Sequence, residues 1–155
     1  MRATEGRVGR VFVLRLEEGD VLPGSIERFA ETKGIVHAQA ILIGGISEGD
    51  VIVGPCREDE RPLRTMKAAV DGVHEVLGAG LLAPGEDGKP VLHMHGALGR
   101  SGRTTTGCFR LGVKTWHLVE AVLWELLDVE ATRVKDESTG LAFLEPGVRP
   151  ASSVD

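Results

Sequence analysis

The chain has 155 residues, of which 42% are apolar and 26% charged, a composition typical of one globular domain with its own core. Eighteen lysines and arginines stand against 23 aspartates and glutamates, which leaves a formal net charge of −5. This charge excludes a strongly basic nucleic-acid binder, because phosphate contacts need clustered cationic side chains. Four phenylalanines and two tryptophans, with no tyrosine, are too few for a base-stacking platform.

The two cysteines, Cys56 and Cys108, do not make a disulfide framework, and a reducing compartment is expected. No signal-peptide pattern follows Met1, and no apolar stretch reaches the length of a membrane span. We therefore expect a cytoplasmic protein that does not enter a membrane. Residues 1–145 are expected to form the domain, and residues 146–155 a flexible C-terminal tail.

Apolar patterning in the first third of the chain predicts strands and one helix. Strands are expected at residues 11–16, 36–43 and 50–54. The helix is expected over residues 24–33, where apolar residues recur at helical spacing and Gly34 supplies a stop. The pair Gly44-Gly45 is expected to break the strand that precedes it.

The rest of the chain is predicted to be strands separated by turns. These strands are expected at residues 63–70, 73–82, 91–98, 104–111 and 129–134, with residues 141–144 pairing back. The apolar stretch 115–127 fits either a helix or a strand that is buried on both faces. The predicted fold class is α+β, with a mostly antiparallel barrel-like sheet and one or two helices.

The stretch Leu92-His93-Met94-His95 carries the strongest chemical signal. Residues i and i+2 of a strand point to one face, so His93 and His95 present two imidazoles side by side. A hairpin centred between residues 100 and 101 would place Cys108 opposite His93. Two imidazoles and a thiolate suit zinc or another divalent transition metal, and they leave a position for water or substrate.

The same residues also have a plainer interpretation. Two histidines on the wetter face of a sheet form ordinary hydrogen bonds, and a lone cysteine is commonly a small buried hydrophobe. Glu120 lies in the apolar run 118–123, where a buried carboxylate needs a partner. It is either a solvent-facing residue, or else a metal ligand or general base. The spacing alone leaves both interpretations open.

The segment Asp87-Gly88-Lys89-Pro90-Val91-Leu92-His93-Met94-His95, followed by Gly107-Cys108, resembles the plants-and-prokaryotes-conserved (PPC) domain. The similarity covers nearly the whole chain. It extends to the first strand and helix (residues 10–26), the glycine-rich turn 44–48, the strand 74–80, and the segments 119–122 and 137–141.

The resemblance implies an α+β fold with an antiparallel barrel-like sheet, a homotrimer, and a strand at residues 115–127. The fold is also similar to that of acetolactate decarboxylase, a metalloenzyme whose three histidines include an H-x-H pair. Many prokaryotic members similarly keep H-x-H and a third histidine, whose place Cys108 takes here. Because thiolate is a good zinc ligand, the resemblance favours a metal at His93, His95 and Cys108, with Glu120 as base or ligand. The alternative is that the metal has been lost.

In plants the domain follows an AT-hook in nuclear DNA-binding proteins, and prokaryotic members are often labelled as predicted DNA-binding proteins. This chain is acidic and has no Arg-Gly-Arg-Pro core. Three hypotheses therefore stand, and they leave open whether the protein is an enzyme. It is a homotrimer whose metal, expected to be zinc, binds or transforms a small molecule. Alternatively it is a DNA-binding or regulatory protein, or a structural trimer with ordinary hydrogen-bonded histidines.

Overall fold

The computed structural model describes residues 1–149, which form nine strands, one α-helix and one short 3-10 helix. In chain order these are β1 (Arg7–Glu17), β2 (Val21–Leu22), α1 (Gly24–Lys33), β3 (Ala38–Pro55), β4 (Thr65–Pro84), β5 (Pro90–Arg100), β6 (Arg103–Cys108), η1 (Phe109–Leu111), β7 (Val113–Leu127), β8 (Ala131–Lys135) and β9 (Ala142–Pro146).

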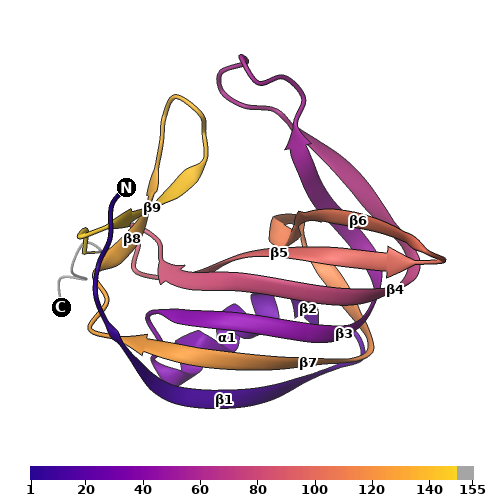
Figure 1. Ribbon diagram of the computed structural model, residues 1–155, viewed down its shortest axis with the longest axis horizontal. Coiled ribbons are helices and arrows are strands. Elements are labelled where there is room, and N and C mark those ends of the chain that lie inside the picture. The colour runs from indigo at the N-terminus through magenta and orange to yellow at the C-terminus, as the bar shows by residue number, and fades with distance from the viewer. Residues whose placement is uncertain (150–155) are drawn as a thin grey trace.

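A seven-stranded antiparallel sheet forms most of the molecule (Figure 1). Its strands lie in the order β1-β7-β3-β4-β5-β6, and the short β2 also pairs with β7. Strand β6 meets β3 again where Cys108 pairs with Ile52, so the sheet curls back on itself. The α+β class and the mostly antiparallel sheet are confirmed. The sheet is only partly closed, and it is not a complete barrel.

Strands β3 and β4 are longer than predicted, with 18 and 20 residues. The expected break at Gly44-Gly45 is wrong, because β3 continues through it with a shift in its register against β7. Gly44 has φ +143°, and a Cβ atom there would lie 2.5 Å from the carbonyl oxygen of Leu118. The glycines therefore let two backbones approach closely where β3 bends. Strand β4 likewise runs through Gly72, which has φ +77°.

The ambiguous stretch 115–127 lies within strand β7, as the family resemblance implies. Strand β7 pairs with β1 on one side and with β3 on the other. Its alternate residues Val119, Ala121 and Leu123 are buried in the core. Its outward-facing positions include the half-buried apolar residues Leu118 and Val122, so the sequence lacks the alternation of polar and apolar residues that identifies a strand.

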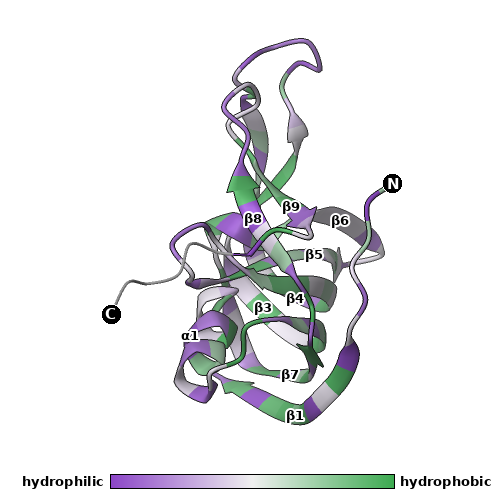
Figure 2. Ribbon diagram, turned by 90° about the vertical axis from the view of Figure 1, so that its left-hand side faces the viewer, coloured by the Kyte–Doolittle hydropathy of each residue, from purple (hydrophilic) through white to green (hydrophobic). Residues whose placement is uncertain are grey.

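The hydrophobic core lies between helix α1 and the inner face of the sheet. Helix α1 covers that face with Ile26 and Ala30, which are fully buried. Figure 2 shows the helix on one side of the curved sheet, with hydrophobic and hydrophilic bands alternating along β1. The helix ends as predicted, because Gly34 adopts the left-handed conformation and its N–H bonds the carbonyl groups of Ala30 and Glu31. No helix within residues 1–149 is long and apolar enough to cross a membrane.

Strands β8 and β9 form a separate two-stranded sheet, which confirms that residues 141–144 pair back on β8. A bridge between Gly85 and Arg133 joins this sheet to the end of β4. The first residues of the expected tail are hydrogen-bonded, since Gly147 donates its N–H to the carbonyl of Glu130 at 2.7 Å. The remainder of that expected tail, 150–155, lies outside the described residues.

Candidate metal centre

His93 and His95 lie on one face of strand β5, as their spacing predicts. The residue between them, Met94, points into the core and is 1% exposed. The two Nε2 atoms are 3.1 Å apart. The imidazole rings meet edge to face, with centroids 4.9 Å apart. The Nε2 atoms of both rings therefore lie at the same place above the sheet.

Cys108 ends strand β6 and lies directly opposite His95. The predicted pairing with His93 is wrong by two residues. The hairpin closes with Arg100 opposite Arg103, so its centre falls one residue later than expected. A shift of two residues keeps the side chain on the same face, because strand side chains alternate with a period of two. The thiol therefore still reaches the two imidazoles.

These three residues form a compact donor set. The ligand atoms of His93, His95 and Cys108 all lie within 4.8 Å of one another. Two nitrogens bound to one tetrahedral zinc at about 2.0–2.1 Å would lie about 3.3 Å apart. The observed 3.1 Å between the Nε2 atoms is close to that spacing. Nitrogen and sulfur donors in this arrangement fit zinc or a similar transition metal.

The electrostatics around His93 keep its imidazole neutral. Partial burial is the largest cause that lowers the pKa of His93, and together with the positive charge of Arg133, the neighbouring His95 and the positive charge of Arg110 it brings that pKa to about 4. A neutral imidazole keeps a lone pair that can bind a metal ion without first losing a proton. His93 is therefore in its metal-binding form at neutral pH.

Two cavities meet at His93 and Arg110. The smaller, about 290 Å³, lies over the three donors and is bordered by Ile52, Leu63 and Phe143. Its walls come from the β3–β4 and β8–β9 hairpins, which project from the same side of the molecule (Figure 1). The larger, about 700 Å³, extends from His93 toward the start of helix α1. The donor set thus borders space large enough for a small organic molecule.

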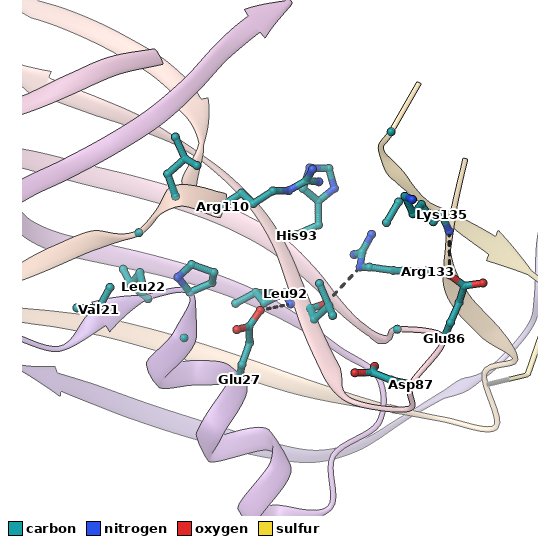
Figure 3. A pocket seen from close by; sticks show the side chains of 18 residues that line it. Val21, Leu22, Glu27, Glu86, Asp87, Leu92, His93, Arg110, Arg133 and Lys135 are labelled. Carbon is teal, nitrogen blue, oxygen red and sulfur yellow. Dashed lines mark hydrogen bonds between the residues drawn. The ribbon is translucent and has the colours of Figure 1, made fainter. Parts of the chain in front are cut away.

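The larger cavity contains two arginines that the sequence analysis missed, Arg110 and Arg133 (Figure 3). Arg110 follows Cys108 by two residues, a spacing that could have suggested a shared face. Arg133 has no local signal in the sequence. It reaches the cavity because β8 folds back beside the ends of β4 and β5, where its guanidinium bonds the carbonyls of Leu81 and Val91.

Glu120 lies elsewhere on the sheet. It is an exposed residue of β7, with Arg15 and Ile43 as its cross-strand neighbours. Three strand spacings, about 14 Å along the sheet, separate β7 from β5. The structure therefore brings His93, His95 and Cys108 together but places Glu120 apart from them within one chain.

Cys56 also lies outside the cluster. It is an exposed free cysteine, whereas Cys108 is a buried one. The two thiols form no disulfide with each other. Cys56 therefore offers a comparison residue of the same chemistry outside the candidate site.

Solved structures share this fold over almost the whole chain. A metal-containing protein from Archaeoglobus fulgidus is 29% identical and matches with a TM-score of 0.81. The match covers 94% of this chain and 99% of the other. A plant- and prokaryote-conserved (PPC) protein from Pyrococcus horikoshii is 26% identical, with a TM-score of 0.80 over 94% and 97% of the two chains. A predicted DNA-binding protein from Ralstonia eutropha is 19% identical, with a TM-score of 0.70 over 86% and 89%.

No curated protein sequence matches this chain. The sequence pattern of the Plants and Prokaryotes Conserved (PCC) domain, in contrast, matches residues 3–127. This segment holds all of the main sheet, helix α1 and the three clustered donors. The chain therefore belongs to the Plants and Prokaryotes Conserved domain family.

Proposed function

We propose that this protein binds a divalent transition metal, with zinc expected, and binds or transforms a small molecule beside it. His93, His95 and Cys108 would hold the metal. The observation that carries this proposal is the convergence of three donor atoms within 4.8 Å at the edge of two cavities. The description of the Archaeoglobus relative as metal-containing supports it, at 29% identity.

The donor set favours a working site over a purely structural one. Three protein donors leave at least one coordination position for water or a ligand, whereas structural zinc sites have four protein donors. When bound, such a metal polarises a carbonyl or lowers the pKa of a bound water. The chain's own contribution is to hold His93 neutral and to flank the donors with two hairpins. Chemistry like that of acetolactate decarboxylase stays a prediction from resemblance.

Metal content tests the proposal directly. Protein purified without chelator, stripped, and reloaded with one equivalent of zinc is dialysed and analysed for bound metal. We expect about one zinc per chain in the wild type. His93→Ala and Cys108→Ser each remove a donor and should weaken zinc binding by at least about 100-fold, more than loss of an outer-shell partner.

Cys56→Ser is the matched control, because it removes the exposed thiol outside the cluster. It should bind zinc as the wild type does. Circular dichroism confirms that each variant is folded before its metal is measured. Stoichiometric zinc in folded His93→Ala, or no zinc in the reloaded wild type, would overturn the metal assignment.

We also infer that the protein assembles with copies of itself as a homotrimer in the cytoplasm. The support is an apolar strip on the outer face of the sheet. Ile43 lies between Leu77 and Glu120 on the neighbouring strands. The side chain of Ile43 is 53% exposed and that of Leu77 is 60% exposed. Val13, in the same sheet, is 81% exposed. Monomeric proteins rarely leave apolar strips of this kind open to water.

A homotrimer also bears on Glu120, which adjoins this strip through its neighbour Ile43. Within one chain the glutamate is too far from β5 to act at the donor set. A catalytic role for Glu120 therefore requires a second copy that brings it to another chain's site, and that role stays a prediction.

DNA binding is the alternative function, and it is supported by the description of the Ralstonia relative. The net charge of −5 opposes it, since each phosphate contact needs a cation. A mobility-shift assay at two salt concentrations decides between the two. A complex that forms at low salt and weakens steeply at higher salt would support DNA binding, and no shift at low salt would exclude it.

A further inference from the structure

Arg133 is a buried cation without an anionic partner. Its residue is 5% exposed, and its guanidinium donates to the carbonyl oxygens of Leu81 at 2.6 Å and Val91 at 3.3 Å. These two bonds use two of its five N–H groups. Within residues 1–149 no carboxylate lies within ion-pair distance of it. A buried charge of this kind is costly to keep unless something pairs with it.

Arg110 brings a second cation to the same place. It borders both cavities, and the described part of the chain gives its side chain neither an ion pair nor a hydrogen bond. Figure 3 shows Arg133 reaching from β8 toward the part of the cavity that holds His93 and Arg110. The two arginines repel each other, and burial together with Arg110 lowers the pKa of Arg133. An anion between the two arginines would offset the cost of burying the Arg133 charge and would reduce the repulsion between the two guanidinium groups.

The acidic residues of the larger cavity are already engaged by backbone amides. Glu27 accepts from the N–H of Leu92 at 2.8 Å, and Asp87 accepts from that of Lys89 at 3.1 Å. Glu86 accepts from the N–H of Lys135 at 3.3 Å, and the Lys135 ammonium bonds Glu137. The charge of Glu27 still raises the pKa of Arg133, but no carboxylate of the described residues forms an ion pair with either arginine beside His93, so their free N–H groups can bind a ligand.

We propose that Arg110 and Arg133 bind the carboxylate of a small organic acid whose remaining polar groups face His93. Guanidinium groups bind carboxylates through paired N–H donors in a fixed plane, so they recognise an acid in preference to its amide. The cavity of about 700 Å³ admits such a molecule. This inference rests on the proposed function, since it names the ligand class of the cavity beside the proposed metal.

Ligand-observed NMR on the zinc-loaded wild type tests the class. The probes are 2-hydroxy and 2-oxo monocarboxylates of two to six carbons, each measured beside its primary amide, together with inorganic phosphate. We expect at least one acid to bind about tenfold or more tightly than its amide. Arg110→Gln, an exposed change that should not disturb folding, should remove most of that difference. Arg133→Lys should also weaken binding of the acid, because a single ammonium does not reproduce the planar pair of donors.

Arg103→Gln is the matched control, since Arg103 is exposed at the β5–β6 turn outside both cavities. It should leave acid binding unchanged. Equal binding of every acid and its amide, or undiminished binding in Arg110→Gln, would overturn the inference, and phosphate binding alone would reassign the site. Repeating the titrations on metal-free His95→Ala separates the two proposals. Arginine-dependent acid binding that persists without metal supports this inference even if the metal assignment fails.

Discussion

Gly96 of β5 lies directly opposite Gly107 of β6, one pair along from His95 and Cys108. Both glycines leave room for close packing. A Cβ atom on Gly96 would lie 2.2 Å from the ring of Phe109, and one on Gly107 would lie 2.7 Å from the carbonyl oxygen of Ile52. The strand pair that carries the donor set is thus held close to the core by the absence of two side chains.

Gly96→Ala should therefore destabilise the protein, because the fully buried Phe109 ring must move to admit a methyl group. Overpacking of this kind costs about 1–3 kcal/mol. Urea unfolding of the metal-free protein measures the change. Gly99→Ala on the same strand is the control, since its nearest contact would be 3.9 Å away, and we expect a change within about 0.5 kcal/mol. Equal stability of Gly96→Ala and Gly99→Ala would contradict the packing argument.

The ion pair between Glu125 and Arg10 should make the fold acid-sensitive. Glu125 is 5% exposed, and two Arg10 nitrogens bond its carboxylate at 2.6 and 2.8 Å. These bonds lower the pKa of Glu125 to about 2, from an ordinary value of 4.5. A carboxyl group whose pKa is lower in the folded than in the unfolded protein gives its full stabilisation at pH values above its unfolded-state pKa. We expect that stabilisation to disappear as the pH falls from about 4.5 to about 2.

Glu125→Gln tests this argument. At pH 7 the variant should lose about 1–3 kcal/mol of unfolding free energy, the usual range for charge-assisted hydrogen bonds. The gap between wild type and variant should then narrow as the pH is lowered toward 2. Glu31→Gln, on the exposed side of helix α1, should show no such gap at any pH. A gap that stays constant from pH 7 to pH 2.5 would show that the Glu125 charge is not responsible.

The outer apolar strip should hold the copies of the proposed trimer together. Replacing Leu77, which faces Ile43 across β3 and β4, with lysine places a charge in the middle of the proposed contact. We expect light scattering to find a trimer for the wild type and a monomer for Leu77→Lys. Val36→Lys is the control, because Val36 precedes β3 and is 52% exposed, close to the 60% of Leu77. This variant should stay trimeric. A wild type that is monomeric at high micromolar concentration would refute the proposal.

Much of the candidate site could be predicted from local sequence because strand geometry has a period of two. His93 and His95 share a face whatever the rest of the chain does. The error in the hairpin centre moved Cys108 from His93 to His95, yet an even shift cannot change the face. The prediction of the donor set therefore survived a wrong register.

The features that sequence reasoning missed depend on contacts between distant segments. Gly44-Gly45 was expected to end a strand, because a local pattern does not show that β7 would approach closely enough to require glycine there. Arg133 was missed because its place in the cavity is set by the bridge to Gly85, 48 positions earlier in the chain. Local patterns predicted the helix, most of the strands and the clustering of His93, His95 and Cys108, but not the arginines beside them.

Cobalt substitution tests whether the thiol of Cys108 itself binds the metal. Cys108 is 6% exposed, and its sulfur belongs to the donor set. A cobalt ion bound by a thiolate has a charge-transfer band in the near ultraviolet that nitrogen and oxygen donors do not produce. We expect that band in the cobalt-loaded wild type and in Cys56→Ser, and we expect Cys108→Ser to lack it. If cobalt binds but the wild type shows no thiolate band, the metal is held by the histidines alone, and Cys108 is only a buried apolar residue beside them.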